Sequence, residues 1–298
     1  MRVMPAARFV RRLQNKEKQM TKLGILHPGQ MGISVAASAQ NSGCEVHWAS
    51  DERSEQTRQR ATQHNLKDAQ TLENLCQTCE VIISVCPPHA ADDLARQVLA
   101  TGFRGIFVEA NAIAPQRAIL MGQRMQAAGI EFVDGGIIGG PAWEAERTWL
   151  YLSGPQAQAV ADCFAAGPLE TAVISTAIGK ASALKMCFAA YTKGTTALLS
   201  GILATAESLG VRNELENQWS RDDSNFSEQT PNRVRQVTAK AWRFESEMKE
   251  IAATLAGAGI PSGFHIAASE IYRRMAIFKD APETPSLDEV LQALLMTQ

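Results

Sequence analysis

The chain has 298 residues, which is enough for two domains or one large one. Its hydrophobic content of 45% and charged content of 20% are ordinary for a soluble globular protein. A net charge of −2 gives no reason to expect nucleic acid or a membrane surface as a partner, and no apolar run reaches the ~20 residues that a bilayer span needs. We therefore expect a cytoplasmic protein that acts on small molecules.

The six cysteines lie mostly within apolar segments. Cys76 and Cys79 form a C-x-x-C pair, but no second pair and no histidine cluster accompany them. We therefore expect no metal site, and the pattern fits a reducing compartment.

Residues 1–21 form a basic extension with a single acidic residue, Glu17. We expect this segment to be disordered, and an arginine-rich targeting leader is the alternative. We exclude it from the fold prediction.

Short apolar runs and helical patterns alternate from residue 22 to residue 178. The expected strands cover 23–26, 45–49, 81–85, 105–109, 131–134, 149–153 and 172–175. The expected helices cover 31–41, 54–64, 71–78, 89–101, 115–128 and 155–165. This alternation is typical of βαβ units, so residues 22–178 are predicted to be a dinucleotide-binding domain with a Rossmann-type, doubly wound, mainly parallel sheet.

Residues 179–298 show only helical patterns, which predicts an all-α second domain. The expected helices cover 180–209, 232–256, 264–278 and 286–296, and the polar stretch 211–231 is expected to be a loop. Ser286 and Glu289 have the spacing of a capping box. The first helix is apolar nearly all round, so we expect it to be buried against a second subunit in a homodimer.

The first strand leads into the turn His27-Pro28-Gly29-Gln30-Met31-Gly32, which opens a helix. Backbone N–H groups at a helix N-terminus bind anions, and Gly29 and Gly32 would allow close approach of a pyrophosphate and of the helix. The usual fingerprint is G-x-G-x-x-G, and here His27 stands at the first glycine. A dinucleotide is the first candidate ligand, contacted by Gly29, Gln30, Met31 and Gly32; an ordinary strand–helix turn is the alternative.

The second strand ends at Ser50, where a Rossmann fold reads the ribose of its cofactor. Arg53, with Ser54 and Thr57, could bind the 2′-phosphate of NADP, so we favour NADP over NAD. In the alternative, Asp51 binds the ribose of NAD and Arg53 is solvated.

Three further strands end in unusual segments. The segment Val85-Cys86-Pro87 comes first, and its proline cannot continue a strand, so we expect the segment to lie against the cofactor. Asn111 follows the next strand, and its side chain is expected to point toward the crevice. Four of the six residues 135–140 are glycines, which suits a backbone that passes close to a substrate, although a flexible connector is the alternative.

Lys185 lies one to two turns into the apolar helix that follows Gly179. A lysine in a cleft has a lowered pKa and can act as an acid or base near neutrality. Most lysines in helices instead reach out to water.

Taken together, these motifs resemble those of the β-hydroxyacid dehydrogenases, the group that contains 3-hydroxyisobutyrate dehydrogenase and 6-phosphogluconate dehydrogenase. The resemblance covers residues 22–210 in order and rests on five segments: His27–Gly32, Val85–Pro88, Glu109–Pro115, Asp134–Gly140 and the spacing from Gly179 to Lys185.

The resemblance implies that Lys185 is the general acid/base and that Asn111, Ile138, Gly139 and Gly140 contact the substrate. Lys249 falls near an active-site lysine of the family. His265 could reach the cleft, and a capping or core histidine is the alternative.

The chain departs from the family pattern at several of these positions. Asn111 and Ile138 stand where the family has serines, and Phe188-Ala189 replaces the His-Asn pair of 6-phosphogluconate dehydrogenases. These changes disfavour phosphogluconate and suggest a larger or less polar substrate. We expect NADP-dependent hydride transfer between nicotinamide and a hydroxy acid or alcohol. An imine reductase and a non-catalytic dinucleotide-sensing protein are the alternatives.

Overall fold

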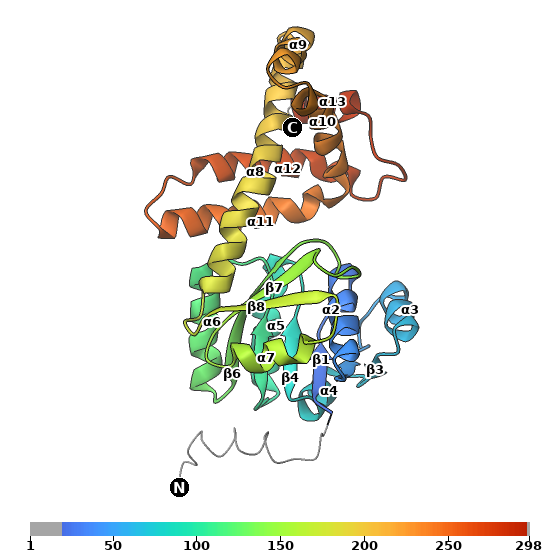
Figure 1. Cartoon of the computed structure of the whole chain (residues 1–298), viewed down its shortest axis with the longest axis vertical. Coiled ribbons are helices and arrows are strands. Elements are labelled where there is room, and N and C mark those ends of the chain that lie inside the picture. The colour runs from blue at the N-terminus through green and yellow to red at the C-terminus, as the bar shows by residue number, and fades with distance from the viewer. Residues whose placement is uncertain (1–19, 297–298) are drawn as a thin grey trace.

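A computed structural model of the chain describes residues 20–296. The basic extension expected at residues 1–21 therefore lies outside the described residues except for its last two. A sheet with helices on both sides forms one end of the molecule, and a group of helices forms the other (Figure 1).

The sheet has eight strands in the order β3-β2-β1-β4-β5-β6-β7-β8. All neighbouring strands are parallel except β6 and β7. This confirms the predicted mainly parallel, doubly wound topology. The strands are β1 (Lys22–Ile25), β2 (Glu45–Trp48), β3 (Lys67–Asp68), β4 (Val81–Ser84), β5 (Ile106–Glu109), β6 (Glu131–Ile138), β7 (Thr148–Ser153) and β8 (Leu169–Ser175).

Helices cover both faces of this sheet because alternate strand residues are apolar on each side. Ile82 and Ile83 of β4 are both fully buried, and they belong to different apolar clusters. One cluster lies with α2 (Gln30–Asn41) and α7 (Ala157–Ala161). The other lies with α4 (Leu72–Thr78), α5 (Ala91–Ala100) and α6 (Pro115–Ala127). Helix α3 (Glu55–Gln63) contributes one buried residue, Ala61.

From Lys180 onward, the described residues form helices and no strand. The long helix α8 (Lys180–Ser208) leads away from the sheet and crosses α11 (Ala241–Gly257) and α12 (Gly263–Met275) (Figure 1). A third apolar core joins these helices, with Met248 and Tyr272 fully buried. The other α-helices of this region are α9 (Arg212–Asp222), α10 (Ser224–Gln236) and α13 (Leu287–Leu295).

The structure also corrects several local predictions. Residues 211–231 are not a loop, because α9 fills most of this stretch and α10 begins within it. Strand β3 was not predicted, and β6 continues through Gly135 and Gly136 to Ile138 instead of ending at Asp134. The capping box of Ser286 and Glu289 is confirmed at the start of α13. None of the helices within residues 20–296 is both long and apolar enough to cross a membrane.

Candidate active site

The glycine turn connects β1 to α2, as the sequence predicts. Gly29 is the N-cap of α2, and no side chain caps the helix there. A Cβ at Gly29 would meet nothing within 4 Å, whereas a Cβ at Gly32 would lie 2.0 Å from the carbonyl oxygen of His27. Gly32 is therefore required for packing. The N–H of Gly29 donates to the carbonyl oxygen of His27 at 2.8 Å, so the N–H groups that this helix end offers to an anion begin with Gln30 and Met31.

Arg53 reaches this turn from the loop after β2. Its Nη1 donates to Nε2 of His27 at 2.7 Å. Burial, with the nearby charge of Arg53 as a second cause, lowers the pKa of His27 to about 4. His27 is therefore neutral at physiological pH, and the positive charge beside the turn belongs to Arg53.

The polar residues around Arg53 mainly shape the start of α3. Ser54 is the N-cap of this helix, and its Oγ accepts from the N–H of Thr57 at 3.3 Å and lies 3.1 Å from Thr57 Oγ1. Ser50 is buried, and its carbonyl accepts the N–H of Arg53 at 3.2 Å. These contacts fix the loop that carries Arg53.

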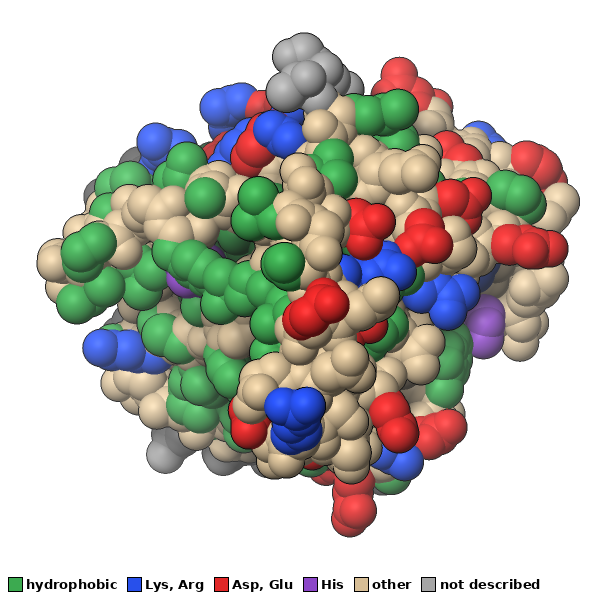
Figure 2. Space-filling model, turned by 90° about the horizontal axis from the view of Figure 1, so that it is seen from above, with side chains coloured by type: hydrophobic (Ala, Val, Ile, Leu, Met, Phe, Trp, Pro, Cys, Tyr) green, Lys and Arg blue, Asp and Glu red, His purple; other side chains and the backbone are tan. Residues whose placement is uncertain are grey.

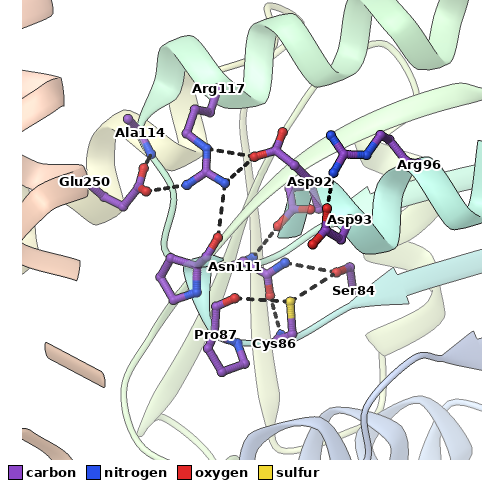
Figure 3. A network of polar contacts seen from close by, with 12 residues as sticks. Ser84, Cys86, Pro87, Asp92, Asp93, Arg96, Asn111, Ala114, Arg117 and Glu250 are labelled. Carbon is purple, nitrogen blue, oxygen red and sulfur yellow. Dashed lines mark hydrogen bonds and ion pairs between the residues drawn. The ribbon is translucent and has the colours of Figure 1, made fainter. Parts of the chain in front are cut away.

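Asn111 ties the end of β5 to the end of β4 (Figure 3). Its Oδ1 accepts the N–H of Cys86, and its Nδ2 donates to Ser84 Oγ at 2.9 Å. The side chain is buried, so it does not extend into the crevice as the sequence suggested. It holds Val85, Cys86 and Pro87 in place, and both ends of its amide group are engaged within the chain.

Glu109 lies behind Asn111 and is completely buried. Its Oε1 accepts the backbone N–H of Asn111 at 3.0 Å, while Oε2 has no partner in the described part of the chain. Burial raises the pKa of Glu109 to about 8, and the neighbouring Asp134 contributes in the same direction. The carboxyl group is therefore mainly protonated at neutral pH.

A second network near the Pro87-Pro88 segment joins the sheet region to the helical region (Figure 3). Arg117 of α6 forms ion pairs with Asp92 of α5 and with Glu250 of α11. Glu250 also accepts the N–H of Ala114 at 2.8 Å. Glu250 thus anchors α11 to the N-terminus of α6, beside the loop that contains Asn111.

Lys185 lies on α8 where this helix packs against β6. A Cβ at Gly136 would come within 2.7 Å of the Ala181 carbonyl oxygen and 3.1 Å of Lys185 Cβ, so the close approach of α8 requires glycine there. Gly136 is two residues beyond Asp134, which pairs with the last residue of β5, so Lys185 lies near the carboxyl edge of the parallel strands. Ligands bind at this edge in doubly wound folds.

Burial lowers the pKa of Lys185 from 10.5 to about 8. The charge of Lys193, two turns further along α8, acts in the same direction, and Glu247 of α11 opposes it. Lys193 and Glu247 are themselves joined in a largely buried ion pair. The amine of Lys185 can therefore both hold and release a proton near neutral pH.

The glycine-rich segment 135–140 lies partly within β6 and partly in the turn after it. Gly135 and Gly136 are part of β6, so they do not belong to a substrate loop. Ile138 ends the strand, Gly139 has φ +127°, and a Cβ there would lie 2.4 Å from the carbonyl oxygen of Arg147. A Cβ at Gly140 would meet nothing within 4 Å, so this residue leaves space beside the backbone.

Two residues expected in the cleft lie elsewhere. The side chain of Lys249 is 61% exposed and pairs with Glu245 one turn earlier on α11, so it faces solvent. His265 is buried between α12 and α8, where its Nε2 lies 3.5 Å from the carbonyl oxygen of Ala190 and is close to Gly194. It is a core histidine, one of the alternatives that the sequence left open.

Sequence reasoning missed the roles of His27, Glu109, Glu247 and Glu250. The signal for His27 was its position at the first glycine of the fingerprint. The acids gave no signal, because ordinary charged residues in a strand or helix reveal nothing about the face they occupy.

Comparisons with known proteins agree with this fold. Residues 22–166 match the NAD binding domain of 6-phosphogluconate dehydrogenase, and residues 206–275 match a domain of unknown function. An uncharacterised 28.5 kDa protein of Methanothermus fervidus is 30% identical over 196 residues, which are 65% of this chain and 74% of that protein.

Two solved structures extend the likeness over most of the chain. A conserved protein of unknown function, described as similar to 3-hydroxyacid dehydrogenases, is 25% identical with a TM-score of 0.63 and covers 87% of this chain and 100% of its own. The 3-hydroxyisobutyrate dehydrogenase of Mycobacterium tuberculosis is 17% identical with a TM-score of 0.67 and covers 93% of this chain and 100% of its own.

The chain belongs to the β-hydroxyacid dehydrogenase family. Its residues 22–166 therefore form an NAD(P)-binding domain.

Proposed function

We propose that this family member is an NADP-dependent oxidoreductase that transfers a hydride between nicotinamide and a hydroxy acid or alcohol, or the corresponding carbonyl compound. The observation that carries the proposal is Lys185, a lysine with a pKa of about 8 near the carboxyl edge of the parallel strands. We take residues 22–178 as the cofactor domain and residues 179–298 as the domain that completes the substrate site.

The residues at the start of α2 fit a dinucleotide. Gly29 leaves open space at an uncapped helix N-terminus, which suits a pyrophosphate, and Arg53 stands beside it as the cation for a 2′-phosphate. When bound, the cofactor supplies the site that gives or accepts a hydride. Val85, Cys86 and Pro87, held by Asn111, form the adjoining wall.

Lys185 acts on the substrate oxygen in this proposal. In the oxidative direction its neutral amine accepts the hydroxyl proton, and in the reductive direction its ammonium group donates a proton to the forming alkoxide. Ile138, Gly139 and Gly140 are the proposed substrate contacts. An isoleucine at the end of β6 suits a larger or less polar substrate.

The decisive experiment is a fluorescence titration with NADPH and NADH. We expect the wild-type protein to bind NADPH more tightly than NADH. In Arg53→Ala the Kd for NADPH should rise by about tenfold or more relative to that for NADH, because a charged hydrogen bond to the phosphate is lost. Arg96→Ala, which removes an exposed arginine of α5, is the matched control. Tighter binding of NADH would contradict the NADP assignment.

A substrate panel then tests the chemistry. Turnover of hydroxy acids or alcohols supports the proposal, and turnover of cyclic imines alone would identify an imine reductase instead. Cofactor binding without turnover on any member of the panel would favour a dinucleotide sensor.

We further propose a cytoplasmic homodimer formed through the helical region. An apolar groove of about 510 Å³ runs between α8, the start of α9 and α12. Leu198 and Phe264, which line it, are 46% and 44% exposed. Figure 2, which views the helical end of the molecule, shows apolar side chains gathered there. A second copy of this chain would bury such a surface.

A further inference from the structure

His27 and Arg53 form a pair that the fingerprint alone does not explain. The guanidinium group has donors only, so Nε2 of His27 must accept the 2.7 Å hydrogen bond from Nη1. The proton of the neutral imidazole is therefore on Nδ1. The lowered pKa of His27 agrees with this neutral form.

The pair leaves Nη2 of the guanidinium group accessible and without a partner among the described residues. Nη1 is engaged with His27, while Nε is buried without a partner among the described residues. The guanidinium group is planar, so the contact at Nη1 fixes the direction of its other donors. An arginine held at Nη1 therefore presents Nη2 to an anion in one fixed orientation.

The surroundings of this pair favour an anion. Arg58 donates from Nε to the carbonyl oxygen of Arg53 at 3.3 Å, and Arg60 donates from Nη1 to the carbonyl oxygen of Pro28 at 3.2 Å. Burial lowers the pKa of Arg53, and the nearby carboxylates of Glu52 and Asp51 act in the opposite direction. Both of these acidic residues are exposed. Three arginines thus converge on the turn between β1 and α2 and the loop after β2.

We propose that His27 is a specificity-determining positioning residue, which orients Arg53 for the 2′-phosphate of the cofactor. This inference rests on the proposed NADP binding. It reverses the meaning of the altered fingerprint, because the histidine at the first glycine position would then strengthen the preference for NADP instead of weakening dinucleotide binding in general.

Three variants test the role of His27. His27→Gly restores the usual glycine and removes the acceptor, His27→Asn keeps an acceptor oxygen, and Arg53→Lys keeps the charge but removes the planar fork. The readouts are the Kd values for NADPH and NADH, and those for 2′-phosphorylated AMP and plain AMP as probes that lack nicotinamide.

We expect His27→Gly to weaken NADPH and the 2′-phosphorylated probe by about tenfold, equivalent to ~1.4 kcal/mol, while NADH and AMP change by less than about twofold. His27→Asn should restore most of the loss, and Arg53→Lys should resemble His27→Gly. A purely structural role of His27 would weaken all four ligands together.

Two results would overturn the inference in different ways. If wild-type protein prefers NADPH and His27→Gly keeps that preference, or gains affinity for all four ligands, His27 does not position Arg53 and the NADP assignment survives. If the wild-type protein itself shows no preference for NADPH, both the assignment and the role of His27 fail.

Discussion

Asp134 and Ser182 are joined by two hydrogen bonds across the junction between the sheet and α8. The N–H of Ser182 donates to Asp134 Oδ2 at 3.0 Å, and the hydroxyl group of Ser182 donates to Oδ1. The N–H of Gly179 also donates to Oδ2 at 3.0 Å. Because Gly179, the N-cap of α8, has no side chain, the buried carboxylate of β6 caps the helix in its place.

Removing this cap should affect both stability and turnover. Asp134→Ala leaves several buried donors unpaired, so we expect the free energy of unfolding to fall by about 3 kcal/mol. Lys185 is three residues beyond Ser182, so kcat should fall while the Kd for NADPH stays close to the wild-type value. Urea unfolding and steady-state kinetics measure the two effects. Asp162→Ala, at an exposed aspartate after α7, is the control, and an equal loss there would show that the cap has no special role.

Lys185 is predicted to lower stability while it supports catalysis. Lys185→Met should reduce kcat by about a hundredfold or more, because proton transfer is lost. The lowered pKa means that burial of the ammonium group destabilises the folded state, by ~1.4 kcal/mol for each pKa unit. Because the side chain is partly exposed, we expect the same change to raise the free energy of unfolding at pH 7 by roughly 1–3 kcal/mol. Lys180→Met, at an exposed lysine of the same helix, should leave both quantities nearly unchanged.

The sign of the pH dependence follows from the lowered pKa of Lys185. Between about pH 8 and 10.5 the unfolded chain holds more protons on this group than the folded chain does, so wild-type stability rises with pH in that range. The stability advantage of Lys185→Met should therefore be complete below pH 8 and fade above it. An advantage that grows at high pH would contradict the burial of the amine.

Glu109 should give the opposite pH dependence. Its folded-state pKa of about 8 exceeds the usual 4.5, so the folded chain keeps a proton that the unfolded chain has lost. Wild-type stability should fall by about 1.4 kcal/mol per pH unit between roughly pH 5 and 8, relative to Glu109→Gln. Glutamine retains an oxygen for the N–H of Asn111. Parallel stability curves for the two proteins would show that Glu109 is charged in the folded state.

The sequence predicted the sheet well because its strands are apolar runs between helical patterns. It missed β3, since Lys67 and Asp68 are exposed and this two-residue strand is defined by its pairing with β2. It also missed α9, which has no buried residue and hence no apolar stripe. Local contacts stabilise this part of the chain instead: Asp223 caps the start of α10, and Trp219 packs edge-to-face on Phe226.

The site was predictable only where a turn or a helix start fixes the geometry. Lys185 and the glycine turn are of this kind. On α11, adjacent positions differ by 100° around the helix, so Lys249 faces solvent while Glu250 reaches Ala114 and Arg117. No single-sequence pattern decides which of two neighbouring charged residues turns inward.

The Arg117–Glu250 pair is expected to couple the sheet region to the helical region. Both side chains are largely shielded, at 28% and 13% exposure, so a double-mutant cycle to alanine should give a coupling energy of about 1 kcal/mol or more. The Arg96–Asp93 pair, at 64% and 63% exposure, should give a value close to zero. Equal coupling in the two cycles would mean that Arg117 contributes no more than a surface ion pair.

The apolar groove of α8 and α12 should determine the oligomeric state. Leu198→Glu puts a charge on the 46% exposed leucine that lines the groove, and burying that charge against a second copy would be costly. We expect the variant to be monomeric by light scattering at concentrations where wild-type protein is dimeric. Leu120→Glu changes a 52% exposed leucine of α6 and should leave the dimer intact. A monomeric wild type, or a dimer that both variants retain, would show that a second copy does not cover this groove.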